Sequence, residues 1–187
     1  MVTKNKFAVL AEISHRMGKD IILVGGGAVE FYTNGWYVTG DLDVIASDRK
    51  KLTTVLSKMG FERLSERHYL KDEIFIDIVG SYFDRRSDEV NIKGTDLKIK
   101  VICVEDIIID RLCACVHWTS DDDCEQAGYL LAVSIKFLDM KYLMQRAAAE
   151  QVLDKLEEIL KEISQIKAKP KKRRSVKQTK RSSRRGV

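Results

Sequence analysis

The chain has 187 residues, about the length of one domain, so we expect a single core with appendages. An apolar fraction of 44% and a charged fraction of 33% are typical of a globular protein, and no apolar stretch approaches the roughly 18 residues that a membrane span needs. No apolar signal segment follows the basic N-terminus, which argues against a secreted protein and favours a cytoplasmic location.

The charge of the chain is distributed unevenly. Eleven of its 33 Lys and Arg residues, and none of its 28 Asp and Glu residues, lie at 167–187, which leaves 22 basic and 28 acidic residues before that segment. The segment has too few apolar side chains to offset the entropy of ordering it, so we expect a disordered basic tail. Such a tail could attract the phosphates of RNA, or it could be a solvated extension without a partner.

Hydrophobic periodicity and the positions of glycine predict the elements in chain order. The first half is predicted to form a helix at 6–17, a strand at 20–24, a helix at 28–32, a strand at 41–45, a helix at 48–59 and a hairpin at 61–80. The second half is predicted to form strands at 90–92 and 97–102 and helices at 105–118, 121–133 and 135–167. This order favours an α/β (α+β) fold, in which a mixed sheet with flanking helices is followed by a helical C-terminal part. We expect a core at 1–103, a helical part at 104–167 packed on the core, and the basic tail at 168–187.

The four cysteines are Cys103, Cys113, Cys115 and Cys124, and none of them forms a CxxC pair. In a chain without a signal peptide we expect reduced thiols, most of them small core residues. A zinc site could be composed from the last three and His117, but Cys113 and Cys115 are two residues apart on a predicted helix and point to different sides.

Three glycines at 25–27 connect a predicted strand to a predicted helix. Backbone N–H groups at such a junction can face an anion, with the helix dipole behind them. The dinucleotide fingerprint GxGxxG is not matched, because Glu30 stands where its third glycine belongs, and no P-loop motif is present. Taken alone, the glycine segment therefore indicates little.

Three aspartates give the glycine segment a meaning. Asp41 and Asp43 alternate with apolar residues at the period of a strand and therefore share one face. Asp77 lies inside the apolar run IFIDIV, where an unpaired carboxylate would be costly. Converging carboxylates are the ligands that a two-metal site for phosphoryl or nucleotidyl transfer needs, so the pattern predicts a Mg²⁺ (or Mn²⁺) site. The alternative is that Asp41 and Asp43 are exposed acids without a ligand.

These residues resemble the signature of the nucleotidyltransferase superfamily with the polymerase β-like fold: a hydrophobic strand, Gly-Gly or Gly-Ser, Asp-x-[Asp/Glu], and a third acid on a later strand. The closer likeness is to small prokaryotic nucleotidyltransferases related to the AbiEii-type toxins. The stretches that carry it are Gly25-Gly26-Gly27-Ala28, Thr39-Gly40-Asp41-Leu42-Asp43, Val104-Glu105-Asp106 and Arg111-Leu112-Cys113-Ala114. The chain departs from these relatives at Tyr37, where Arg is common, and at Arg111, where Lys is common. The likeness covers roughly residues 18–145.

The resemblance implies that Asp41, Asp43 and Asp77 are catalytic and hold the metal. It also implies that the nucleotide is bound by Gly25, Gly26, Gly27, Thr39 and Arg111. An internal ion pair is an equally good interpretation of Arg111. Asp121, Asp122 and Asp123 are interpreted as the acidic first turn of a helix, and His15, His68 and His117, without triad partners nearby in sequence, as non-catalytic.

We therefore expect an enzyme that moves an NMP from an NTP such as ATP to an acceptor hydroxyl, with RNA as a possible acceptor held by the basic tail. The alternative is a catalytically silent member of the same fold that binds RNA or a protein partner. A toxin restrained by an antitoxin protein is a biological role compatible with the enzymatic interpretation.

Overall fold

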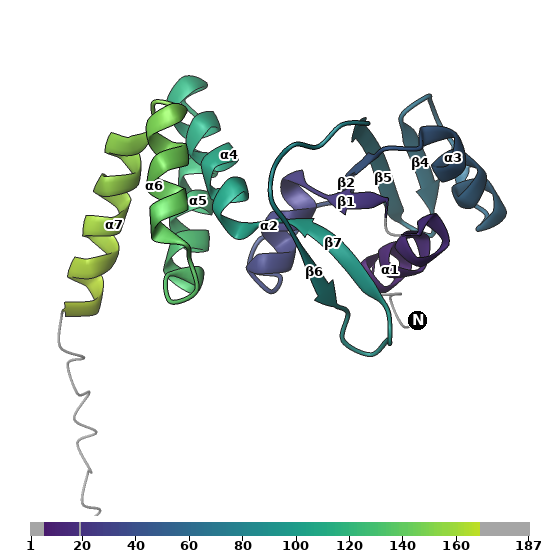
Figure 1. Ribbon diagram of the computed structural model, residues 1–187, viewed down its shortest axis with the longest axis horizontal. Coiled ribbons are helices and arrows are strands. Elements are labelled where there is room, and N and C mark those ends of the chain that lie inside the picture. Colours follow the sequence, from purple (N-terminus) through teal and green to yellow (C-terminus); the bar gives the residue numbers. More distant parts are fainter. Residues whose placement is uncertain (1–5, 19, 169–187) are drawn as a thin grey trace, which may run out of the picture.

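The computed structural model of the protein describes residues 6–18 and 20–168. Figure 1 shows two parts side by side along the longest axis of the molecule. One is a sheet with its helices, and the other is a group of helices formed by the second half of the chain. No helix in the described part of the chain is both long and apolar enough to cross a membrane.

The sheet contains seven strands in the order β3-β4-β5-β2-β1-β7-β6. Their bounds are β1 Ile21–Leu23, β2 Asp41–Ala46, β3 Glu62–Arg63, β4 His68–Lys71, β5 Ile74–Gly80, β6 Ser87–Asn91 and β7 Lys98–Ile102. The central pairs are mixed, because β1 is antiparallel to β2, whereas β2 is parallel to β5 and β1 is parallel to β7. The predicted α/β (α+β) class with a mixed sheet is thus confirmed.

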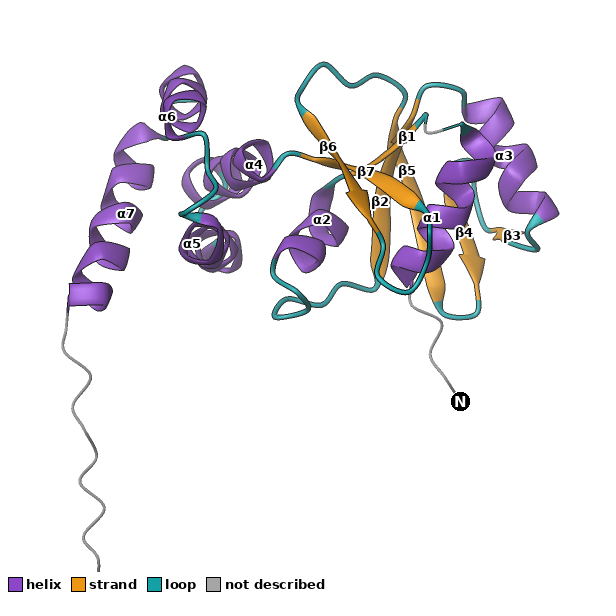
Figure 2. Ribbon diagram, turned by 60° about the horizontal axis from the view of Figure 1, so that its bottom comes forward, coloured by secondary structure: helices purple, strands orange, loops and turns teal. Residues whose placement is uncertain are grey.

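Three helices, α1 Lys6–Met17, α2 Gly25–Tyr32 and α3 Arg49–Lys58, cover one face of the sheet (Figure 2). The strands turn their apolar residues to these helices, and the centre of the core is fully buried at Leu23, Leu42, Val44, Ile76 and Val101. Because side chains alternate along a strand, the residues between these positions lie on the opposite face. Asp41, Asp43 and Asp77 are on that opposite face, which we call the carboxylate face.

The second half of the chain forms α4 Val104–His117, α5 Asp121–Ser134, α6 Met140–Ala149 and α7 Leu153–Ala168. The single helical region predicted at 135–167 was wrong, because the chain turns between α6 and α7, where Gln151 has a φ of 61°. The predicted apolar stripe is on α7 and its N-cap, where Val152 and Leu156 are buried and Ile166 is exposed.

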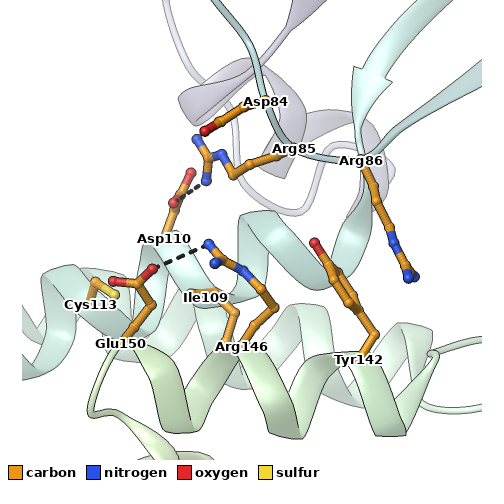
Figure 3. Close-up of a pocket in the computed structure, with 9 residues that line it drawn as sticks. All are labelled: Asp84, Arg85, Arg86, Ile109, Asp110, Cys113, Tyr142, Arg146 and Glu150. Atoms are coloured by element: carbon orange, nitrogen blue, oxygen red, sulfur yellow. Dashed lines mark hydrogen bonds and ion pairs between the residues drawn. The ribbon is translucent and has the colours of Figure 1, made fainter.

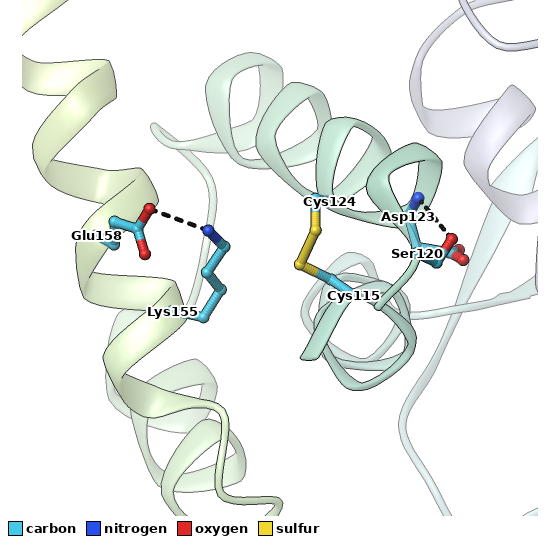
Figure 4. The surroundings of a disulfide bond; sticks show 6 residues. All are labelled: Cys115, Ser120, Asp123, Cys124, Lys155 and Glu158. Carbon is cyan, nitrogen blue, oxygen red and sulfur yellow. Dashed lines mark hydrogen bonds and ion pairs between the residues drawn. A yellow bond between two sulfur atoms is a disulfide. The ribbon is translucent and has the colours of Figure 1, made fainter. Parts of the chain in front are cut away.

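The expectation of reduced thiols is wrong for one pair, because Cys115 and Cys124 form a disulfide (Figure 4). Thr119, with a φ of 53°, lies in the sharp turn between α4 and α5, and the two Cα atoms come within 4.8 Å. Cys103 and Cys113 are free, and Cys113 lies on another side of α4 from Cys115, as the helical spacing predicts. The disulfide leaves no cysteine set for the zinc site that was weighed.

β7 ends at Ile102 and α4 begins at Val104. The division into a core at 1–103 and a helical part at 104–167 stays a prediction. The basic tail predicted at 168–187 lies outside the described residues, apart from its first residue, which ends α7.

Candidate active site

The glycine segment forms the first turn of α2, which begins three residues earlier than the prediction of 28–32. Gly25 has a φ of 56°, a conformation that favours glycine, and a Cβ there would overlap the carboxylate of Asp43. A Cβ at Gly27 would approach Leu23 Cδ1 to 2.8 Å, so this glycine lets α2 pack closely on β1. The glycines therefore bring the N-terminus of α2 against the sheet at the position of Asp43.

The amide of Gly26 makes the contact between this helix end and the acids. Its N–H donates to Asp43 Oδ2 over 3.1 Å, and the N–H of Val24 donates to the backbone oxygen of Asp43 over 2.9 Å. Val24 occupies the N-cap and has no side-chain acceptor, so the carboxylate of Asp43 takes the place of a helix cap. The glycine turn was predicted to face phosphate, whereas in the structure one of its N–H groups donates to a carboxylate.

The parallel pairing of β2 and β5 brings Asp77 beside Asp43. Asp43 is the register partner of Asp77, and Asp41 is the partner of Phe75 on the same face. Neighbouring strands are about 4.8 Å apart, so the carboxylates of Asp43 and Asp77 start from adjacent positions. The structure thus places the three acids singled out in the sequence on one face of two adjacent strands.

The electrostatics of Asp43 reflect this crowding. Burial raises the pKa of Asp43 above its ordinary value, and the negative charges of Asp77 and Asp41 raise it further. The hydrogen bond from Gly26 and the positive charge of Arg111 act in the opposite direction. The net shift of this pKa is upward because burial, its largest cause, disfavours the charged form of the carboxyl.

Asp77 already has a cationic partner, Arg67. Arg67 Nη2 donates to Asp77 Oδ2 over 2.8 Å and to Oδ1 over 3.0 Å, and Nε donates to Oδ1 over 3.1 Å. His68 Nε2 lies 3.6 Å from Asp77 Oδ1, and its Nδ1 contacts Ser65 Oγ at 3.0 Å. His68 thus has Asp77 and Ser65 as neighbours, and its interpretation as non-catalytic stays a prediction.

Thr39 lies at the edge of the glycine turn. A Cβ on Gly26 would come 3.3 Å from Thr39 Oγ1, and this hydroxyl accepts a hydrogen bond from the N–H of Asp41 over 3.3 Å. Glu30 Oε2 accepts from the N–H of Thr39 over 2.8 Å and from Lys6 Nζ over 2.6 Å. Glu30, which breaks the dinucleotide fingerprint, thus holds the segment that carries Thr39 into β2.

Arg111 projects from α4 and makes an ion pair of 2.8 Å with Asp123 in the first turn of α5. The internal ion pair that the sequence left open is therefore formed. Its charge nevertheless acts on Asp43, and its buried Nε lacks a hydrogen-bond partner within the described residues. A buried N–H without an acceptor is uncommon, so this N–H can donate a hydrogen bond to an oxygen of a ligand.

A divalent cation fits the chemistry of the carboxylate face. Asp41, Asp43 and Asp77 supply hard oxygen donors from one face of two paired strands. The three are not gathered into a ready-made site, since no group of three or more His, Cys, Asp or Glu side chains in the described residues is close enough to hold an ion. Asp77 does not complete such a group, because both of its oxygens already accept hydrogen bonds from Arg67.

A second polar cluster lies apart from this face. A pocket of about 790 Å³ is bordered by residues 84–86, α4 and α6 (Figure 3). Beside it, Asp106 is fully buried and accepts hydrogen bonds from Tyr142 Oη at 2.9 Å and Arg146 Nε at 3.3 Å. Glu105 accepts from the N–H of Asp139 over 2.7 Å. Glu105 and Asp106 of the sequence motif therefore stabilise the contact between α4 and α6.

Arg67 is the residue of the candidate site that the sequence analysis missed. The register of the β4–β5 hairpin would have indicated it, because a two-residue turn at Asp72 and Glu73, both with positive φ, pairs His68 with Asp77. The sequence analysis located the hairpin at 61–80 without placing its turn. The strand pairing, and with it the neighbours of Asp77, therefore remained open.

The solved structures that are similar to this chain include the following two. The antigenic nucleotidyltransferase-like protein from Paracoccidioides brasiliensis has a TM-score of 0.57 and 19% identity over 83% of this chain and 91% of that one. The antibiotic-resistance factor ANT(2'')-Ia has a TM-score of 0.55 and 13% identity over 87% of this chain and 100% of its own. At such identities the likeness shows the fold alone.

None of the curated proteins matches the chain. The closer kinship with AbiEii-type toxins stays a prediction. Residues 4–180 match the family described as "Nucleotidyltransferase of unknown function (DUF6036)", and the chain belongs to this nucleotidyltransferase family.

Proposed function

We propose that the protein transfers an NMP from an NTP, such as ATP, to an acceptor hydroxyl with Mg²⁺ (or Mn²⁺) bound at the carboxylate face. The observation that carries the proposal is the position of Asp43. Its carboxylate lies beside Asp77 across two parallel strands and also receives the N–H of Gly26 at the start of α2. A helix N-terminus and adjacent carboxylates thus meet at one point, which suits a metal-bound triphosphate.

In this proposal, Asp41 and Asp43 hold the cations and Asp77 completes the set. The bound metal supplies positive charge to the phosphate oxygens and to the leaving group. The acceptor oxygen forms a bond to the α-phosphorus, the bond from that phosphorus to the bridging oxygen breaks, and pyrophosphate leaves. The hydroxyl proton passes to the carboxylate of Asp77, which by that stage no longer accepts hydrogen bonds from Arg67.

Arg111 and Thr39 are proposed to contact the nucleotide. The unpaired Nε of Arg111 can donate to a phosphate oxygen while Nη1 remains on Asp123, so the ion pair would hold the guanidinium in place. Thr39 Oγ1 stands over the glycine turn and has a hydroxyl proton to donate.

The acceptor is proposed to be RNA, held near the carboxylate face by the basic segment at 167–187, whose eleven cations can contact phosphates without reading bases. Deletion of residues 168–187 should then reduce RNA affinity and its salt dependence while nucleotide affinity is unchanged. Unchanged RNA affinity at low salt would redirect the search to protein or small-molecule acceptors. A cytoplasmic toxin-like role, with an antitoxin protein as its partner, is compatible with this activity.

The test of the function is a labelling experiment. The protein is incubated with each of the four α-³²P-labelled NTPs, Mg²⁺ and total RNA, and the labelled product is identified. Asp43→Asn should lower labelling at least roughly 100-fold, the scale of losing one group that stabilises transition-state charge. Asp20→Asn, a change of the same kind at an exposed position, should leave labelling intact. If Asp43→Asn labels RNA like the parent, this site does not transfer nucleotides, and nucleotide binding without any labelling would indicate the catalytically silent alternative.

A further inference from the structure

We propose that Arg67 is an exchangeable ligand of the carboxylate face: it neutralises Asp77 when no metal is bound and moves to the triphosphate when metal and nucleotide enter. The inference rests on the proposed function and adds a substrate-contacting residue to it. The geometry of the ion pair, the anchoring of its backbone and the charge balance of the site support it in turn.

The ion pair occupies the atoms that a metal would need. Three hydrogen bonds of 2.8–3.1 Å join the guanidinium of Arg67 to both oxygens of Asp77. A guanidinium has donors only, so each oxygen that it contacts offers fewer lone pairs to a cation. Full coordination of a metal by Asp77 therefore requires that Arg67 withdraw.

Arg67 is free to withdraw because only its backbone is fixed. Its carbonyl oxygen accepts from the N–H of Ile78 over 3.0 Å, and its own N–H donates to Ser65 Oγ over 3.1 Å. The side chain, in contrast, is 52% exposed, whereas that of Asp77 is 17% exposed. The guanidinium can thus leave Asp77 for water at low cost while the chain that carries it stays in place.

The charge balance explains why an arginine is useful at this position. Asp41, Asp43 and Asp77 lie on one face of two paired strands, with Asp43 directly beside Asp77. Without a cation the three carboxylates repel one another, and Arg67 offsets one of the three charges. Two divalent cations would reverse the balance, because they add four positive charges to the site and repel the guanidinium from Asp77.

The displaced guanidinium would remain beside the bound nucleotide. His68, the next residue, pairs with Asp77 in the sheet, so the side chain of Arg67 starts at the edge of the carboxylate face. A triphosphate brought there with the metal offers several anionic oxygens, and the planar fork of arginine binds such groups through two parallel N–H donors. Arg67 would accordingly stabilise the β- and γ-phosphates and then the leaving pyrophosphate.

The experiment compares two ligands that should respond in opposite directions. Mn²⁺ affinity is measured by electron paramagnetic resonance without nucleotide, and the affinity for a non-hydrolysable ATP analogue is measured by calorimetry in excess Mg²⁺. Arg67→Gln should bind Mn²⁺ several-fold more tightly, because Asp77 is free, and the analogue about tenfold more weakly, because a charged contact to phosphate is lost. Arg67→Lys, which keeps the charge and loses the fork, should fall between the parent and Arg67→Gln for the analogue.

The matched control is Arg63→Gln, which removes the same charge from the same hairpin at a side chain that donates to the backbone of Ser65 instead of Asp77. It should alter neither affinity by more than about twofold. Equal effects of Arg63→Gln and Arg67→Gln would reduce the role of Arg67 to general attraction, and unchanged or weaker Mn²⁺ binding in Arg67→Gln would overturn the exchange. Both readouts are binding constants. If the parent protein labels RNA but Arg67→Gln does not shift the two affinities in opposite directions, only the role of Arg67 is rejected. If the parent protein binds neither Mn²⁺ nor the ATP analogue, the proposed function itself is rejected.

Discussion

Two of the clusters in which an aspartate accepts hydrogen bonds from an arginine differ in completeness. Asp106, between α4 and α6, is 0% exposed and accepts from Tyr142, Arg146 and the backbone N–H of Arg86. Asp77, on the carboxylate face, depends mainly on Arg67, whose side chain is half exposed. One cluster is closed and the other is open to exchange.

The difference separates an acid that links two helices from one that we propose to act in the reaction. A buried carboxylate whose oxygens are all satisfied stabilises the contact that it bridges, and no ligand can reach it without unfolding that contact. A carboxylate that is crowded by other acids and held by a solvated arginine can change partners at little cost. Asp106 belongs to a stretch that carries the family resemblance, so membership of a motif alone does not identify a catalytic group.

The largest effect on stability that tests this comparison is expected from Asp106→Asn. The substitution keeps the shape of the side chain and removes the buried charge that pairs with Arg146, whose remaining charged partner is Glu150. The free energy of unfolding should fall by about 3–5 kcal/mol, as when one member of a buried ion pair is removed. Urea unfolding followed by circular dichroism measures this loss. The control Asp110→Asn breaks the partly exposed pair with Arg85 and should cost less than about 1 kcal/mol.

A smaller loss of stability is expected when the disulfide is opened. Cys115 and Cys124 close a short loop between α4 and α5, and a cross-link of this size contributes about 2–3 kcal/mol. The double variant Cys115→Ser/Cys124→Ser should lose that amount in the same urea experiment. Thiol labelling of the unfolded parent should count two free cysteines before reduction and four after it, and four at the outset would mean that the bond does not form.

The smallest expected effect has the opposite sign and concerns Asp43. Its pKa in the folded state is raised above the ordinary value of 3.8, so ionisation of this carboxyl lowers stability. The stability that the protonated carboxyl of Asp43 contributes is fully present below the ordinary pKa and is lost as the pH rises through the raised pKa of the folded state. Asp43→Asn does not titrate, and its melting temperature should therefore exceed that of the parent slightly at pH 7.

This gain of Asp43→Asn should shrink as the pH is lowered towards 3, and differential scanning calorimetry across this range measures it. A variant less stable than the parent at pH 7 would show that Asp43 is needed for folding in the way that Asp106 is, and the comparison between the two clusters would fail. Expected together, a small gain in stability and a large loss of labelling would identify Asp43 as a group retained for function.

Features that depend on nearby residues were predictable from the sequence. The alternation of apolar residues with Asp41 and Asp43 indicated that the two acids share a strand face, and Ser120 before three aspartates indicated the start of α5. The glycines at 25–27 indicated the junction between a strand and a helix. The fold class followed from the order of such elements, because local hydrophobic period determines whether a segment packs as a helix or as a strand.

Only the tertiary structure decided which of these groups meet. The sequence does not encode, in any local pattern, that β2 lies parallel to β5 with Asp43 beside Asp77, or that Arg67 reaches Asp77 from the neighbouring strand. The pairs Arg111–Asp123 and Cys115–Cys124 likewise depend on how sharply the chain turns between α4 and α5. Strand register and helix packing result from the burial of the whole core, and a one-residue change in register would turn Asp77 towards the other face of the sheet.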